Sequence, residues 1–283
     1  MRGCFILLVL LSICLAAPAE RFQYIPLKKD KTYPLTLSAN KDNPQLTDIF
    51  VDLPAQNELR TLGTHADVYT DHPHPVEYQG ESLYLLKKKK TFNGTLTELW
   101  QQRGNKSILV YAAYDYLTFR VSPDDNYIAI FADQKLLLVS TAGEKKRILN
   151  RTDLHPKNAP DKAVYNLQPA GWNNTEFWFV LKNSQNRVER VFYISTQNWK
   201  YIPYDNLPFK PVEYDINPLG HIAYSDHGLN SKQNVFTLYT YNLRSKKTDV
   251  VATSNYKFEP EWRGDRLDFN SPVNGQTRVT KFE

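Results

Sequence analysis

The sequence predicts an all-β protein made of repeated four-stranded sheets, and three observations support this. Short runs rich in Val, Ile, Tyr and Phe alternate with turns of Gly, Pro, Asn and Asp, whereas windows of helical period are nearly absent. The composition, with 41% hydrophobic and 13% aromatic residues, is that of a globular chain and excludes disorder. One pattern of turn and apolar strand also recurs along the chain, which predicts a repeat architecture.

The recurrence is clearest at five apolar positions that each follow a turn. They are 45, 49, 45 and 45 residues apart: Leu83, Ile128, Phe177, Ile222 and Leu267. Each unit has room for about four strands, which in the second unit are expected at 117–121, 127–131, 135–141 and 146–149. Such a period is typical of a β-propeller, in which radial stacking of the sheets buries both faces of each.

The block 119–131 carries a resemblance to a known family. Its turn, Ser122 to Asn126, resembles the Ser-Pro-Asp-Gly turn of TolB-type propellers, a WD-like repeat that also builds the propeller of dipeptidyl-peptidase-type enzymes. Asp125 and Asn126 stand where the family prefers Gly, and both residue types tolerate left-handed backbone. The turns at 217–220 and 262–265 match more loosely. The resemblance implies the architecture and no particular activity.

The number of blades depends on how the chain ends are used. The fifth unit ends after its third strand, 277–282, and lacks an outer one. Residues 57–62 are expected to supply that strand, so that the ring is closed by pairing of N- and C-terminal strands. Residues 48–53 are then a surplus strand. The sequence therefore favours five blades and leaves six open, with the N-terminal segment as the remnant of the sixth.

Residues 1–19 have the pattern of a secretory signal peptide. The apolar run from Cys4 to Ala17 is short of the ~20 residues that span a bilayer, and Ala17-Pro18-Ala19 provides small residues for cleavage after Ala19. Residues 20–44 are expected to be an N-terminal extension, and 45–283 a single propeller domain. We therefore expect a periplasmic or secreted protein that does not span the membrane.

Cleavage would remove both cysteines, Cys4 and Cys14, and leave a net charge of +4. Without cysteine, the mature chain has no disulfide, thiolate nucleophile or zinc–sulfur site. This favours a bacterial periplasm, because extracellular animal domains often depend on disulfides. Secretion from a eukaryotic cell remains an alternative, because the chain has four N-glycosylation sequons, at Asn93, Asn105, Asn150 and Asn173. The modest charge and the secreted address argue against a nucleic-acid partner.

The candidate site is the mouth of the propeller channel, where loops entering the first strand of each unit meet loops between the second and third strands. Eight residues are expected there: His72, His74, Tyr114, Asp115, Tyr116, Asp205, Asp226 and His227. Imidazoles and carboxylates at one place can bind a divalent metal or transfer protons. However, the spacing of His72 and His74 also occurs in plain surface loops, and no helical His-x-x-x-His pattern accompanies it. The sequence therefore predicts neither a metal nor a cofactor.

Two enzyme classes are alternatives to a binding site. A glycosidase needs two carboxylates ~5–9 Å apart, and the expected inner strands carry Glu77, Asp215, Glu259 and Glu261. A serine hydrolase is not supported, because the chain has no Gly-x-Ser-x-Gly motif. We therefore expect a non-catalytic scaffold that binds a protein partner in the cell envelope, with a glycan-cleaving enzyme or a metal- or ligand-binding propeller as the alternatives.

Two surface features leave alternatives open. The densest basic run contains four lysines: Lys87, Lys88, Lys89 and Lys90. It is either a solvated hairpin or a site for an anionic surface such as lipid headgroups. Trp172 and Trp262 share one turn position, with Tyr78 as their near equivalent. These aromatics form either a partner-binding belt or plugs between adjacent blades.

Overall fold

The computed structural model describes the greater part of the chain, in these ranges: 20–26, 34–53, 56–114, 116–156, 164–173, 175–204, 207, 209, 211, 214–217, 219–227, 235–263, 266–270 and 277–281. The signal-peptide prediction, residues 1–19, lies outside them. Regular structure in these ranges is almost entirely β-strand, with a short 3₁₀ helix at Arg151–Leu154. No helix among them is long and apolar enough to cross a membrane.

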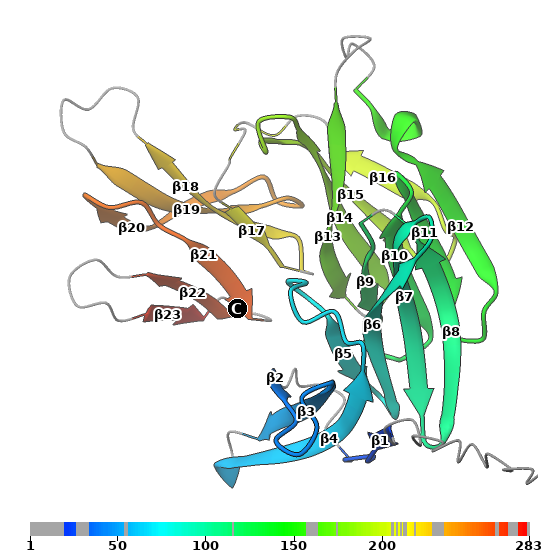
Figure 1. Cartoon of the computed structure of the whole chain (residues 1–283). Helices are drawn as coiled ribbons and strands as arrows, with labels where there is room; N and C mark the ends of the chain where they lie inside the picture. The colour runs from blue at the N-terminus through cyan, green and yellow to red at the C-terminus, as the bar shows by residue number, and fades with distance from the viewer. Residues whose placement is uncertain are drawn as a thin grey trace, which may run out of the picture.

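The described strands form six antiparallel sheets, numbered here along the chain (Figure 1). The first sheet has the strand order β1 (Arg21–Phe22), β4 (Glu58–Ala66), β3 (Leu46–Leu53) and β2 (Leu35–Ala39). The second contains β5 (Val76–Gln79), β6 (Ser82–Thr91), β7 (Gly94–Arg103) and β8 (Lys106–Ala113). The third contains β9 (Thr118–Val121), β10 (Tyr127–Ala132), β11 (Lys135–Ser140) and β12 (Lys145–Asn150).

The remaining three sheets follow the same plan. The fourth contains β13 (Tyr165–Asn173), β14 (Glu176–Asn183), β15 (Val188–Ser195) and β16 (Tyr201–Tyr204). The fifth contains β17 (Tyr214–Ile216), β18 (His221–His227), β19 (Phe236–Asn242) and β20 (Thr248–Ser254). The sixth has three strands, β21 (Pro260–Arg263), β22 (Arg266–Asn270) and β23 (Thr277–Lys281).

The sheets are arranged as the blades of a β-propeller, which confirms the predicted fold class. In the second to sixth sheets, strands that follow one another in the chain are neighbours, and the first strands β5, β9, β13, β17 and β21 contact one another in turn. Figure 1 shows these five strands facing the middle of the molecule. The five repeat positions all lie buried on second strands, from Leu83 on β6 to Leu267 on β22. The 45-residue register therefore marks one blade per repeat.

The core is divided into five apolar clusters, each between two consecutive sheets. Strand β6 shows why its sequence is apolar without a break. Leu83 and Leu85 pack toward the first sheet, whereas Tyr84 and Leu86 pack toward the third. Successive side chains of a strand point to opposite faces, and here both faces are covered.

The predicted closure of the ring is wrong. Residues 57–62 were expected to complete the last blade, but β4 pairs with β3 and β1 in a sheet of its own, and β23 pairs with β22. The hairpin from Leu53 to Glu58 is local, and a short loop has a smaller closure entropy than pairing with the far end of the chain. The six-unit alternative therefore describes the chain.

The first sheet takes both of its edge strands from the segment 20–44, which the sequence analysis placed outside the propeller. Strand β1 pairs with β4 through Phe22 and Gly63. A Cβ atom at Gly63 would lie 2.4 Å from the carbonyl oxygen of Arg21, so only glycine admits this strand. The side chain of Tyr78 on β5 then holds the following segment, donating to the carbonyl oxygen of Ile25 at 2.7 Å.

Candidate functional site

A layer of charged side chains occupies one repeat position on four of the first strands. Glu77, Arg120, Asp215 and Glu261 each pair with the residue that follows the buried repeat position of the second strand. Because the first strands of adjacent blades contact one another, this layer lines the middle of the propeller. It contains three of the four carboxylates that a glycosidase interpretation would use.

Two of these carboxylates join neighbouring blades. Glu77 Oε2 accepts the N–H of Val121 at 2.8 Å, and Asp215 Oδ2 accepts the N–H of Trp262 at 2.6 Å. Each acceptor belongs to one sheet and each donor to the first strand of the next sheet. On the inner edge of a first strand, the backbone N–H groups have no neighbouring strand of the same sheet to accept their hydrogen bonds. When these groups are buried, they need other acceptors. The two carboxylates therefore serve as caps between blades.

The surroundings of the two caps differ electrostatically. Burial raises the pKa of Glu77, while Arg120, whose Nη1 lies 3.2 Å from Glu77 Oε1, opposes that rise. Burial raises the pKa of Asp215 to about 6; its backbone hydrogen bonds oppose the rise, and the negative charge of Glu261 adds to it. Asp215 therefore takes up a proton in mildly acidic solution, at a higher pH than an ordinary aspartate.

Where the loop entering β5 meets the loop entering β9, three aromatic rings and a lysine form a row that we call the aromatic column. The ammonium of Lys88 lies 4.4 Å from the ring centroid of Tyr69, which lies 5.4 Å from that of His72. His72 in turn stacks on Tyr116 at 5.1 Å with an interplanar angle of 26°. The column connects hairpin β6–β7, the loop entering β5 and the loop entering β9, so these three segments share one face.

The two histidines of this loop have different surroundings. His72 is 4% exposed and its Nδ1 accepts the backbone N–H of His74 at 3.0 Å, whereas His74 is buried only in part. Partial burial and the charge of Arg120 lower the pKa of His74 to about 4, and burial lowers the pKa of His72. Both imidazoles are therefore neutral at pH 7. Within the described ranges no group of three or more His, Cys, Asp and Glu is placed to hold a metal ion.

The other predicted site residues lie as follows. Tyr114 and Tyr116 are exposed, and Tyr116 is the one that joins His72 in the column. Asp226 is exposed near the end of β18 in the fifth sheet, and His227, whose side chain is not described, ends that strand. The remaining two positions lie outside the described residues: Asp115 and Asp205. The structure thus brings His72 and Tyr116 together and places Asp226 and His227 on another blade.

The recurring aromatics are plugs between blades. Trp172 and Trp262 are 6% and 9% exposed and belong to the apolar clusters that join their sheet to its neighbour. Trp172 Nε1 donates to the carbonyl oxygen of Arg120 in the preceding blade at 3.0 Å. Tyr78 packs against the first sheet in the same way. This confirms the packing interpretation over the partner-binding belt.

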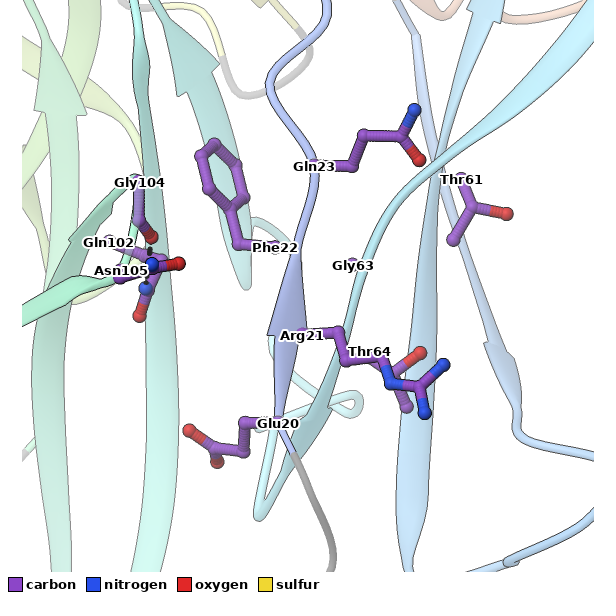
Figure 2. Close-up of a pocket in the computed structure, with 10 residues that line it drawn as sticks. All are labelled: Glu20, Arg21, Phe22, Gln23, Thr61, Gly63, Thr64, Gln102, Gly104 and Asn105. Carbon is purple, nitrogen blue, oxygen red and sulfur yellow. Dashed lines mark hydrogen bonds between the residues drawn. The ribbon is translucent and has the colours of Figure 1, made fainter.

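A pocket of about 720 Å³ lies beside β1, at the junction of the first and second sheets (Figure 2). Figure 2 shows Phe22 pointing toward the turn that carries Gly104 and Asn105, with Gln23 and Thr61 on the other side of β1. Its lining is mostly polar. No sequence pattern points to this pocket, because β1 is only two residues long.

Comparisons with known proteins show the fold alone. No family model matches the chain, and no curated protein matches it. The β-propeller domain of the Trilobed protease from Pyrococcus furiosus, which has an open velcro topology, is similar with a TM-score of 0.53 at 10% identity. That match covers 92% of this chain and 82% of the domain.

Two further solved structures match over smaller shares. An uncharacterised Listeria monocytogenes protein has a TM-score of 0.42 at 12% identity, and the match covers 71% of this chain and 63% of that one. The acylaminoacyl peptidase of Pyrococcus horikoshii has a TM-score of 0.49 at 10% identity, with coverage of 74% and 37%. The chain therefore spans less than two thirds of each of these two proteins.

Proposed function

We propose that this protein is a periplasmic or secreted, non-catalytic propeller that binds a protein partner in the cell envelope. The binding surface is the mouth face, defined by Tyr69, His74, Lys88, Tyr114 and Tyr116. The signal-peptide pattern of residues 1–19 supports the periplasmic or secreted location. The Ser122 to Asn126 turn supports a relation to TolB-type repeats, and the propeller fold is compatible with it.

The observation that carries the proposal is the aromatic column with its exposed end. Tyr116 is 62% exposed, yet one face of its ring is fixed by stacking on the buried His72. Tyr114 is 54% exposed two residues earlier. A large aromatic side chain held in place loses little conformational entropy when a partner covers it, and Tyr is enriched among residues that dominate binding energy.

The carboxylates in the middle of the propeller support binding over glycan cleavage. A retaining or inverting glycosidase needs two carboxyl groups free to meet the substrate. Glu77 and Asp215 instead accept backbone N–H groups of the next blade, which gives both a structural role.

Site-specific photo-cross-linking tests the proposal. A photoreactive residue at position 116 is compared with one at position 250, on β20, where Val250 is 64% exposed and lies in the fifth sheet. In cells that express the protein, we expect a discrete protein adduct from position 116 and none from position 250. Adducts of equal yield from both positions, or turnover of a glycan that is lost in Asp215→Asn, would overturn it.

A further inference from the structure

The hairpin of β6 and β7 extends beyond its sheet. Its two strands pair from Ser82–Arg103 as far as Thr91–Gly94, with a turn at Phe92 and Asn93. The neighbouring strand β8 pairs with β7 only as far as Thr97, and β5 pairs with β6 only as far as Leu85. The last three residue pairs of the hairpin therefore form a two-stranded ribbon outside the four-stranded blade.

The tip of this ribbon combines an exposed aromatic ring with positive charge. Phe92 is fully exposed, with a relative exposure of 104%. Lys88, Lys89 and Lys90 are also exposed, and no acidic residue occurs between positions 87 and 97. Within the described part of the chain, neither Lys89 nor Lys90 forms an ion pair.

The fourth lysine of the run is used differently. Lys87 Nζ forms an ion pair with Glu20 Oε1 at 2.5 Å and lies over the ring of Trp100 at 5.7 Å. Its side chain is only 15% exposed. The structure thus divides the basic run: Lys87 holds the N-terminal segment, and the three lysines beyond it remain at the surface with Phe92.

From this placement we infer that the hairpin tip docks on an anionic lipid surface, with Phe92 inserted at the headgroup level and the lysines near the lipid phosphates. Aromatic rings favour the membrane–water interface, and lysines beside an inserted ring can keep their ammonium groups among the headgroups. Each lysine near an anionic surface adds a favourable electrostatic contribution that salt screens. The charge of the tip, whose own sequence between positions 87 and 97 has no acidic residue, complements phosphate and opposes a basic partner.

This inference is independent of the proposed protein partner, although Lys88 links both surfaces through its contact with Tyr69. A peripheral contact of this kind is reversible, because one ring and three charges bind far more weakly than a membrane-spanning segment. It orients the mouth face with respect to the membrane, since hairpin and mouth lie on the same side of the second sheet.

Vesicle co-sedimentation tests the inference. The full chain is mixed with phosphatidylcholine vesicles that contain one quarter phosphatidylglycerol, and with pure phosphatidylcholine vesicles. All variants are compared side by side, so that any contribution of residues 1–19 is common to them. We expect binding to the anionic vesicles that falls in 0.5 M salt, about fivefold weaker binding for each of Lys89→Gln and Lys90→Gln, and about tenfold weaker binding for Phe92→Ser.

The matched control is Lys246→Gln with Lys247→Gln, two exposed lysines in the turn between β19 and β20. This double variant should bind like the parent. A Phe92→Trp variant adds a direct readout, because its fluorescence should shift to the blue on anionic vesicles only. Equal binding of the parent and Phe92→Ser, equal loss in the control, or no fluorescence shift would overturn the inference, and so would a tip that binds only a protein.

Discussion

The junction of the second and third sheets and the junction of the fourth and fifth sheets occupy the same place in the repeat and are built from opposite chemistry. In the first, Asp125 Oδ1 accepts the hydroxyl of Tyr84 at 2.7 Å, and Gln101 Nε2 donates to the same hydroxyl at 2.8 Å. In the second, Trp178 occupies the repeat position that Tyr84 has in the first. Gly220, in the turn of the next blade, lies against the ring of Trp178.

The difference shows what the repeat register determines. The register places the second strand of one blade against the turn of the following blade. It does not determine which residue types form that contact. A buried polar network allows one alignment of its donors and acceptors, so it defines how two blades meet. An aromatic ring over glycine depends on close packing, and here Arg244 of the next blade also lies over the ring of Trp178 and forms an ion pair with Glu176. The polar junction belongs to the two blades that carry the aromatic column.

The largest effect is expected from breaking the polar junction. Asp125→Ala leaves the hydroxyl of Tyr84 without its acceptor and places alanine at a φ of +58°, so we expect the free energy of unfolding to fall by about 3 kcal/mol. Asp125→Asn keeps an acceptor and tolerates the backbone, and should lose about 1 kcal/mol. Urea denaturation measures both. Equal losses would show that the network does not stabilise the junction.

A smaller effect is expected at the apolar junction. Gly220 has a φ of +83°, and a Cβ atom there would lie 3.0 Å from the ring of Trp178, so Gly220→Ala should cost about 2 kcal/mol. Gly143, with a φ of +88° and no atom within 4 Å of its Cβ position, is the matched control. Gly143→Ala should cost about 1 kcal/mol from backbone strain alone. If both variants melt alike, the ring contact does not constrain the turn.

The next prediction separates the two carboxylate caps by their pH dependence. The pKa of Asp215 is raised to about 6 in the folded protein, so the folded state holds more protons than the unfolded state between pH 4 and 6. Stability from this group is present below pH 4 and is lost as the pH rises through 6. Relative to Asp215→Asn, the parent should therefore lose about 1 kcal/mol over this range, since solvent screens a partly exposed group.

Glu77 is the internal comparison for that measurement. Burial also raises its pKa, against the opposing charge of Arg120, so Glu77→Gln should change the pH profile in the same direction as Asp215→Asn. Thermal unfolding at several pH values between 4 and 7 provides both profiles. A change in the opposite direction for Glu77→Gln would contradict a raised pKa at this site.

The smallest effect on stability is expected at the mouth face. Tyr116 is exposed, so Tyr116→Ala should change the free energy of unfolding by less than about 0.5 kcal/mol. Differential scanning calorimetry tests this. A loss of several kcal/mol would make Tyr116 a structural residue and would remove the main support for a binding role.

Much of the fold was predictable because the second to fifth blades bury both faces. That requirement makes the second strands continuously apolar, so Leu83 and its equivalents show the period directly. The first sheet was not predictable in the same way. Strand β1 is two residues long, and β4 contains the polar run of Glu58, Arg60 and Thr61.

The site was predictable in part for a similar reason. The repeat predicts that His72 and Tyr116 lie in loops entering neighbouring first strands, and the structure stacks their rings. Tyr69 and the role of Lys88 were missed, because their contact depends on an isolated bridge between Val68 and Lys87 that leaves no pattern in the sequence. The carboxylate caps could have been predicted from the sequence, because Glu77 and Asp215 occupy the same repeat position.

We propose that the mouth face binds a protein partner through Tyr116. Titration calorimetry tests this binding most directly. It measures the affinity of the cross-linked partner for the parent, for Tyr116→Ala and for Val250→Ala, with all three proteins at equal thermal stability. We expect at least tenfold weaker binding for Tyr116→Ala, because a fixed, exposed tyrosine should contribute more than about 1.4 kcal/mol of the binding energy. Val250→Ala should bind like the parent. Equal affinity of Tyr116→Ala and the parent would contradict the claim.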